Sequence, residues 1–278
     1  MLENNTKNLT YSEPPSTSQL FLEFPKASFE LMQLRNKAWK RTLHKAHPGD
    51  GHSVMTIPGF GGGDGSMLFL RRYLGQLGYC SEPWGLGTNL PKGRVTDMDQ
   101  IIDYCRDTEA AIAQNCESIV QRTGEKVSLI GWSLGGVFAN VLAQTRPDLI
   151  RQIITLGAPI GDPRGTSTWD LLRKMSRSDV PENMQNVSEW LKRKDGLGER
   201  EVRTSVLYST SDGAVSKGSA VIDGHHLVEN IKVKSSHMGF AHNPLVYWVI
   251  ADRLSQHPAA WEAFEVGRQP RLIQKKLR

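Results

Sequence analysis

Short apolar segments alternate with helical patterns along most of this chain, and this alternation limits its possible folds more than any other feature. Near-continuous apolar strands separated by helices are typical of a parallel sheet that helices cover on both faces. Six segments are predicted strands: HSVMTIPGF from residue 52, YCSEPWGLG from 79, KVSLIGWS from 126, IRQIITLGAPI from 150, RTSVLYSTSD from 203 and ENIKVKSSH from 229. The sequence therefore predicts an α/β fold with a mostly parallel central sheet.

Local signals bound the predicted helices. Residues 30–45 have helical spacing of apolar side chains, and residues 96–124 form a longer pattern that ends at a glycine. A helix after the glycine-rich loop is predicted to have Ser66 as its N-cap and to stop at Gly78. The closing helix is predicted to begin with Pro244 in its first turn.

The alternation stops between residues 161 and 200, where two short amphipathic helices are predicted instead. The strands resume after this segment, and no internal repeat is present. Residues 1–18 are polar and interrupted by prolines, which predicts a flexible tail. We therefore expect one domain over residues 19–278 with a helical insertion at about 161–200.

Composition excludes several classes of function. The formal charge of +5 comes from scattered Lys and Arg residues that form no basic stripe, so we expect no nucleic-acid partner. No window approaches the ~20 apolar residues of a membrane span, and the first residues do not resemble a secretory signal. The basic end RLIQKKLR is interpreted as solvated. The three cysteines have neither CxxC nor zinc-site spacing, so we expect a reduced, cytoplasmic chain without a metal.

The segment GWSLG, residues 131–135, matches the pattern G-x-S-x-G at a point where a predicted strand meets a predicted helix. A nucleophilic serine on such a sharp turn needs small neighbours, because larger side chains would collide with the adjacent strand and helix. The turn also presents the serine at a helix N-terminus, where developing negative charge is favoured. Ser133 is therefore the predicted nucleophile.

A serine nucleophile needs a general base, and in sites of this kind the acid and then the histidine follow the serine along the chain. His237 ends the last predicted strand, at the sheet edge where Ser133 is also expected. His242 is the alternative, although it precedes the closing helix. His225 and His226 come before the last strand and are expected at its far end.

The acid that orients the histidine is expected after the penultimate strand. Asp212 occupies this position in a polar, glycine-containing turn. Asp162 is the alternative, because it follows the strand that ends in LGAPI. Asp223 is the weaker candidate, because no clear strand precedes it.

The loop TIPGFGGGDGS, residues 56–66, first resembles a dinucleotide-binding turn. The spacing argues against this interpretation, because Asp64 and Ser66 stand where the pattern requires glycine or alanine. A carboxylate in the loop would also repel a pyrophosphate. We therefore expect no nicotinamide and no other cofactor.

Together, PGFGGGDGS, GWSLGG, TLGAP, YSTSDGAV and SSHMGFAHNP resemble the α/β-hydrolase family, specifically its bacterial esterase- and lipase-like members. The resemblance spans about residues 53–256. It implies Ser133 as nucleophile, His237 as general base and acid, and Asp212 as the orienting partner. One departure is visible: many relatives have His-Gly before the oxyanion residue, whereas this chain has Pro58-Gly59.

The resemblance also implies the remaining site residues. The backbone N–H groups of Phe60 and Leu134 would form the oxyanion hole. The insertion at about 161–200 lies where relatives place a cap. Its helices could cover the site and bind an acyl chain, or they could serve only as extra packing. The expected substrate-binding residues are Trp132, Trp169, Leu172 and Met175.

The leading hypothesis is hydrolysis of a small-molecule acyl ester through an acyl-enzyme on Ser133. The same triad serves acyl transfer and thioester cleavage, so both remain alternatives. A hydrolase-fold protein used only for binding is a further alternative. It is disfavoured because none of the three triad positions is missing.

Overall fold

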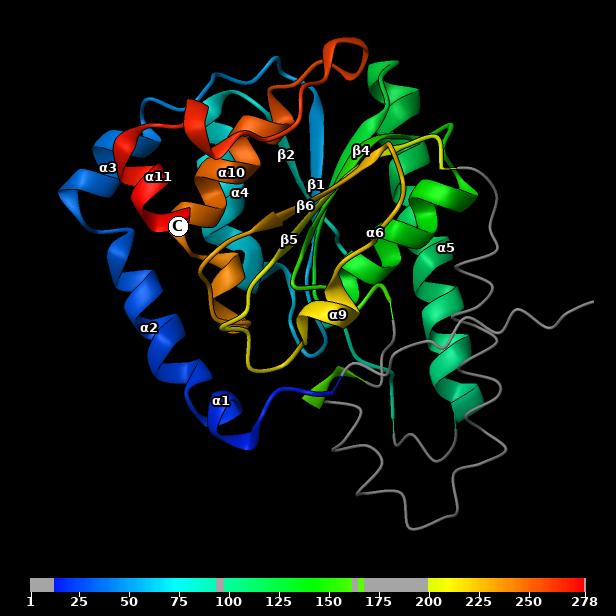
Figure 1. The fold of residues 1–278 in the computed structure, drawn as a ribbon. Helices are drawn as coiled ribbons and strands as arrows, with labels where there is room; N and C mark the ends of the chain where they lie inside the picture. Colours follow the sequence, from blue (N-terminus) through cyan, green and yellow to red (C-terminus); the bar gives the residue numbers. More distant parts are fainter. Residues whose placement is uncertain (1–12, 94–97, 162–164, 168–199, 278) are drawn as a thin grey trace, which may run out of the picture.

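The computed structural model describes residues 13–93, 98–161, 165–167 and 200–277. A six-stranded sheet lies at its centre (Figure 1), in the order β2-β1-β3-β4-β5-β6, and every neighbouring pair of these strands is parallel. The strands are β1 (Ser53–Ile57), β2 (Cys80–Pro83), β3 (Val127–Trp132), β4 (Ile150–Leu156), β5 (Arg203–Tyr208) and β6 (Val228–Lys232). The predicted α/β class with a parallel sheet is confirmed.

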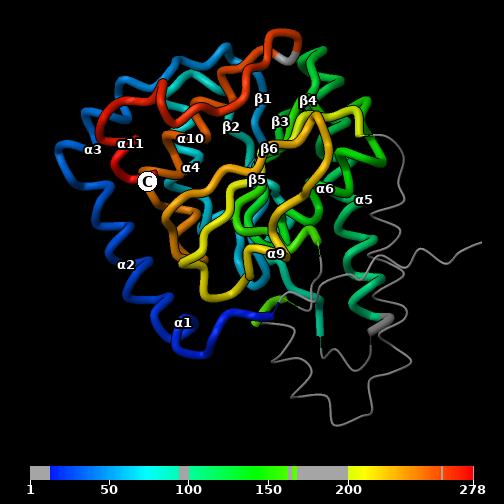
Figure 2. Tube along the Cα trace, in the orientation of Figure 1, coloured from blue at the N-terminus to red at the C-terminus, as the bar shows by residue number. Residues whose placement is uncertain are grey.

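Helices cover both faces of the sheet, as Figures 1 and 2 show from the same side. One face packs against α3 (Lys37–Leu43), α4 (Leu68–Leu77), α10 (Pro244–Leu254) and α11 (Arg271–Leu277). The other face packs against α5 (Met98–Thr123) and α6 (Leu134–Thr145). Strand residues alternate between these two cores: Ile130 and Ile154 face the first, whereas Leu129 and Ile153 face the second. This is the period of two expected of strands that are buried on both sides.

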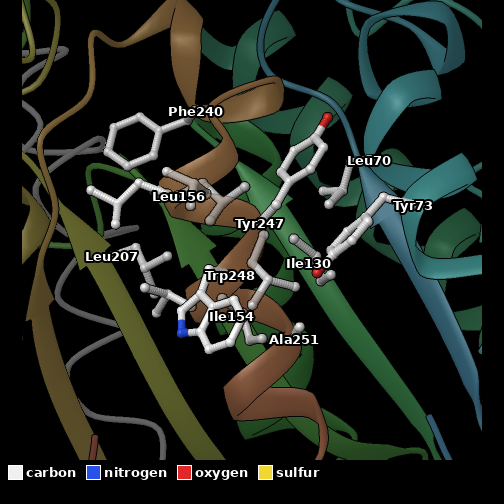
Figure 3. Close-up of a cluster of buried hydrophobic side chains, with 14 of the residues drawn as sticks. Leu70, Tyr73, Ile130, Ile154, Leu156, Leu207, Phe240, Tyr247, Trp248 and Ala251 are labelled. Atoms are coloured by element: carbon white, nitrogen blue, oxygen red, sulfur yellow. The ribbon is translucent and has the colours of Figure 1, made fainter. Parts of the chain in front are cut away.

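The first core is built around α10, all of whose residues are buried. Figure 3 shows the side chains of Tyr247 and Trp248 from this helix among apolar side chains of the central strands. The Tyr247 ring stacks on Tyr73 of α4 with ring centroids 5.2 Å apart. The helix begins with Pro244 as predicted, and the Asn243 side chain accepts a hydrogen bond from the Leu245 N–H group as its N-cap.

Two predicted helix boundaries are wrong. The helical pattern over residues 30–45 is divided between α2 (Glu23–Gln33) and α3, because the Asn36 side chain accepts a hydrogen bond from the Ala38 N–H group and starts a new helix. Ser66 is not the N-cap of α4, because it lies inside the 3-10 turn η1 (Asp64–Met67) and its hydroxyl donates to the Gly63 carbonyl. Gly78 ends α4 in a left-handed conformation, as predicted.

The remaining elements are short. They are α1 (Thr17–Phe21), α9 (Lys217–Ala220), and the 3-10 turns η3 (Met238–Ala241), η4 (Pro258–Ala260) and η5 (Val266–Arg268). Most of the predicted insertion at about 161–200, and most of the predicted tail at 1–18, lie outside the described residues. Among the helices that are described, none is long and apolar enough to cross a membrane.

Candidate active site

Ser133 occupies a strained turn between β3 and α6. Its φ of 52° and ψ of −121° make it the one non-glycine residue with positive φ in the described part of the chain. Side chains rarely adopt this conformation, which costs on the order of 1–3 kcal/mol and persists only where the surroundings enforce it. Here the Ser133 N–H group donates to the Leu156 carbonyl of β4 at 3.0 Å, and the Ser133 carbonyl accepts from the Gly136 N–H group at 2.9 Å.

The glycines on either side of Ser133 let strand and helix approach each other. A Cβ atom on Gly131 would lie 2.3 Å from the Gly135 carbonyl oxygen. A Cβ atom on Gly135 would lie 2.4 Å from the carbonyl oxygen of Ile57 in β1. No side chain fits at these distances, so the turn GWSLG depends on glycine at both ends.

His237 and Asp212 are joined by a buried hydrogen bond. His237 Nδ1 lies 2.9 Å from Asp212 Oδ2. Because a carboxylate only accepts, Nδ1 carries the proton and donates. In the neutral ring this leaves the lone pair on Nε2, the state that a general base requires. The structure thus brings together the predicted acid and base from the ends of two neighbouring strands.

The Asp212 carboxylate is held on its other side by backbone. Its Oδ1 atom accepts hydrogen bonds from the N–H groups of Ala214 and Val215, both at 2.8 Å. Gly157, at the end of β4, makes room for this carboxylate, because a Cβ atom there would lie 2.8 Å from Asp212 Oδ2. The orientation of the acid is therefore fixed before any substrate binds.

The pKa of His237 is raised above its ordinary value. Burial is the largest single influence and acts in the opposite direction, because it disfavours the charged imidazolium. The negative charge of Asp212, the hydrogen bond to it and the charge of Glu23 together outweigh burial. These surroundings therefore stabilise the protonated form of the His237 ring.

Trp132 links the serine turn to the histidine. Its indole Nε1 donates to the His237 carbonyl at 3.0 Å, and its ring centroid lies 5.8 Å from that of the imidazole. Among the described residues no hydrogen bond joins Ser133 Oγ to His237. Hydrogen bonds of this kind are often long in unliganded sites and tighten when substrate binds.

The loop after β1 lies against Ser133. A Cβ atom on Gly59 would lie 3.1 Å from Ser133 Cβ, so the loop backbone approaches the serine closely. Neither the Phe60 nor the Leu134 N–H group donates to an acceptor in the part of the chain that the structure describes. Backbone N–H groups without an internal acceptor are able to donate to a negatively charged oxygen.

Asn89 holds this loop in place. Its side chain is fully buried, and its amide donates to the Pro58 carbonyl at 2.7 Å while accepting from the Tyr104 hydroxyl at 2.6 Å. Its backbone carbonyl accepts from the Gly61 N–H group at 2.8 Å, and its own N–H group donates to the Gly62 carbonyl at 2.7 Å. Sequence reasoning missed Asn89, because a single loop asparagine belongs to no motif.

The carboxylate of Asp64, in the glycine-rich loop, has a structural role. Its oxygens accept hydrogen bonds from the N–H groups of Trp84 at 3.1 Å and Gly85 at 3.3 Å, and Arg71 lies beside it at 3.4 Å. The carboxylate thus ties the loop to the segment after β2.

A second Ser-His-Asp network lies near the amino-terminal ends of β1 and β3, away from Ser133. His52 Nε2 lies 2.8 Å from Ser128 Oγ, and His52 Nδ1 contacts Asp50, which also pairs with Arg151. Burial lowers the pKa of His52, because it disfavours the charged form of the ring. His52 is 2% exposed and Ser128 is completely buried, so no substrate reaches this serine. The network ties β1 to β3 and cannot act as a nucleophile site.

The alternative histidines lie elsewhere. His225 and His226 stack on each other before β6, at the end of that strand opposite to His237. His242 ends η3, and burial lowers its pKa. Asp223 is exposed. The alternative acid Asp162 and the expected substrate-binding residues Trp169, Leu172 and Met175 lie outside the described residues.

The described residues contain no group of three or more His, Cys, Asp or Glu side chains that could hold a metal ion. Cys80 is exposed, Cys105 and Cys116 are buried, and none of them forms a disulfide.

The chain resembles known hydrolases in sequence and in fold. Residues 90–214, which contain Ser133 and Asp212 but end before His237, match the model of the alpha/beta hydrolase fold family. The mature form of Bacillus licheniformis lipase BlEst2 is similar in structure, with a TM-score of 0.54 and 17% identity over 76% of this chain and 95% of that chain.

Two further solved structures are similar at low identity. A structure of the metagenome-derived lipolytic enzymes LipS and LipT has a TM-score of 0.52 and 17% identity over 75% of this chain and 93% of that chain. Aspergillus fumigatus lipase B has a TM-score of 0.53 and 18% identity over 82% of this chain and 60% of that chain. At such identities the likeness concerns the fold, and one fold hosts many activities. The match over residues 90–214, the parallel sheet and these structural likenesses together show that the chain has the α/β-hydrolase fold.

Proposed function

We propose that this protein is a serine hydrolase that cleaves carboxylic esters with Ser133 as nucleophile, His237 as general base and acid, and Asp212 as the residue that orients the histidine. The observation that supports this proposal most directly is the conjunction of a strained, half-buried Ser133 with a buried His237–Asp212 hydrogen bond at one edge of the sheet. Strain of this kind concentrates at functional sites.

The proposed reaction has two steps. Ser133 Oγ attacks the acyl carbonyl while His237 Nε2 takes its proton, and the N–H groups of Phe60 and Leu134 stabilise the resulting oxyanion. The intermediate collapses, the bond to the alkoxy group breaks, and His237 returns the proton to the leaving alcohol. Water then attacks the acyl-enzyme with His237 as base, which releases the carboxylic acid and restores Ser133.

Exposed apolar side chains favour an apolar acyl group. Phe60 directly follows Gly59 and is 55% exposed, although large apolar side chains are usually buried. Met238 directly follows His237, Leu90 directly follows Asn89, and both are also exposed. Apolar side chains around a few polar groups are the usual composition of a small-molecule site.

The proposal is tested by labelling and turnover. Wild-type protein should react with a fluorophosphonate and hydrolyse a short p-nitrophenyl ester, and Ser133→Ala should lose both activities. Ser128→Ala is the matched control, because this serine also contacts a histidine but is sealed in the core. The control should keep both activities. Labelling that persists in Ser133→Ala would contradict the assignment.

A series of esters and thioesters of increasing acyl length, each with and without an alcohol acceptor, then defines the reaction. Hydrolysis of esters supports the proposal. Faster cleavage of thioesters, or transfer to the alcohol in place of hydrolysis, would replace it with one of the two related activities. No turnover and no labelling would favour a binding role.

A further inference from the structure

Helix α2 buries two glutamates beside Ala27 and leaves several of its large apolar side chains exposed. Glu23 and Glu30 are only 4% and 9% exposed, whereas Phe24 and Met32 are 71% and 68% exposed. This is the reverse of the usual amphipathic helix, in which the apolar face is buried. Burying a carboxylate is costly unless hydrogen bonds compensate for the lost water, so the partners of these two glutamates matter.

Glu23 joins the two turns that carry the proposed acid and base. Its Oε1 atom accepts from the N–H group of Gly213 at 2.7 Å, and its Oε2 atom accepts from the N–H group of Met238 at 2.9 Å. Gly213 directly follows Asp212, and Met238 directly follows His237. One carboxylate from the N-terminal part of the chain thus contacts the backbone directly after Asp212 and directly after His237.

Glu30 lies two helical turns further along α2. It contacts the segment of His237 but does not connect it to the segment of Asp212. It accepts from the N–H group and the hydroxyl of Ser236 and from the Asn243 side chain. Burial, the largest influence, raises the pKa of Glu30. A Cβ atom on Gly239 would lie 1.6 Å from Glu30 Oε2, so this glycine lets α2 approach the turn.

We propose that Glu23 is a positioning residue of the site: its carboxylate fixes the distance between the turns of Asp212 and His237, and its charge stabilises the imidazolium formed during the reaction. This inference rests on the proposed function. Helix α2 lies outside residues 90–214, the range that matches the family model. The role therefore belongs to a part of this chain that the family match does not include.

Several charged groups face the turns of His237 and Asp212. Asp212 contacts the ring itself, Glu23 and Glu30 contact the backbone on either side of it, and Lys26 Nζ donates to the Ser211 carbonyl at 3.2 Å. Of these, Asp212 and Glu23 raise the pKa of His237 by their charge. Removing the charge of Glu23 should therefore lower that pKa, and removing the charge of Glu30, which bonds to Ser236 and Asn243, should change it less.

The test compares Glu23→Gln with Glu30→Gln, the same isosteric change on the same helix. The His237 midpoint is measured by an NMR titration of the ring C–H signal, which is identified by its loss in His237→Asn. Glu23→Gln should move this midpoint, and the acid limb of kcat/KM, to lower pH. It should also lower kcat by about tenfold, the loss expected from one hydrogen bond to a charged group. KM should stay within about twofold, because Glu23 is buried and its two oxygens bond to backbone N–H groups. Rates are normalised to active sites counted with a fluorophosphonate.

An unchanged midpoint in Glu23→Gln, or an equal shift in Glu30→Gln, would overturn the inference. Glu23→Asp is the second variant, because it keeps the charge but is one methylene too short to reach both N–H groups. It should lower kcat and keep the midpoint near that of wild type. Wild-type kcat in Glu23→Asp would contradict the bridging role even if Glu23→Gln does not fold. The titration requires no ester, so failure of the wild type to hydrolyse esters contradicts the proposed function and not this inference.

Discussion

His237 Nδ1 lies 2.9 Å from Asp212 Oδ2, and both side chains are almost completely buried. Each residue comes from the turn after a different strand, so the contact exists only when β5 and β6 pair in their parallel register. Backbone N–H groups hold the other carboxylate oxygen of Asp212, which directs Oδ2 to the imidazole. The first prediction follows from this geometry.

Asp212→Asn should lower kcat by about 10⁴-fold with little change in KM, the loss found when a triad acid becomes an amide. The amide would donate to the imidazole through its NH2 group, or leave Nδ1 without a carboxylate, and either case disfavours the productive tautomer. Steady-state kinetics on a p-nitrophenyl ester measures the effect. Asp162→Asn is the comparison, because Asp162 is the alternative acid. If Asp162→Asn loses kcat while Asp212→Asn keeps it, the acid is Asp162.

The pH profile of kcat/KM should have an acid limb with its midpoint above the ordinary histidine value of about 6.5. The base must be neutral to accept the serine proton, and the charges of Asp212 and Glu23 raise the pKa of His237 despite its burial. Activity should therefore rise with pH through this midpoint and then level off. The profile is measured from pH 5 to 9 with an ester whose leaving group does not titrate in that range. A flat profile between pH 5 and 8 would exclude a histidine base.

Asn89→Ala should lower kcat more than it changes KM. The substitution removes the donor to the Pro58 carbonyl and loosens the loop that carries the Phe60 N–H group. Loss of one oxyanion donor costs about 10²–10³ in kcat, and a displaced donor should cost up to about 10². Thermal unfolding is recorded in parallel, because an unpaired buried carbonyl also costs about 1–3 kcal/mol of stability.

Tyr104→Phe is the graded control for this prediction, because it removes the hydroxyl that donates to Asn89 Oδ1 but leaves the bond to Pro58. It should have a smaller effect on kcat than Asn89→Ala. A destabilised Asn89→Ala protein with wild-type kcat would assign Asn89 to folding alone.

Local sequence was sufficient where local chemistry decides the structure. Apolar strands between helical patterns predicted the parallel sheet, because only a sheet buried on both faces needs strands without polar alternation. The glycines around Ser133 predicted the sharp turn, because no side chain fits where strand and helix meet. Chain order and strand ends indicated His237 and Asp212, which lie together.

Local sequence was insufficient to place helix boundaries where two possible hydrogen bonds compete within a few residues. Residues 30–45 have continuous helical spacing, yet the Asn36 side chain starts a new helix because it satisfies a free N–H group. Ser66 has the side chain of an N-cap, but its hydroxyl donates to the Gly63 carbonyl within a 3-10 turn. Such boundaries depend on which hydrogen bond forms, and composition does not decide this.

The sequence alone therefore determined the α/β fold and the order of the residues that meet at the end of the sheet, since periodicity, glycine sterics and chain order are local properties. Only the tertiary structure decided how those residues are supported. Asn89 clamps the loop of Phe60, and Glu23 bridges the turns of Asp212 and His237 from about 190 and 215 residues away along the chain. A buried polar group needs hydrogen-bond partners, and only folding brings these partners to it. The sequence of α2 therefore does not reveal that Glu23 and Glu30 point inward while large apolar side chains are exposed.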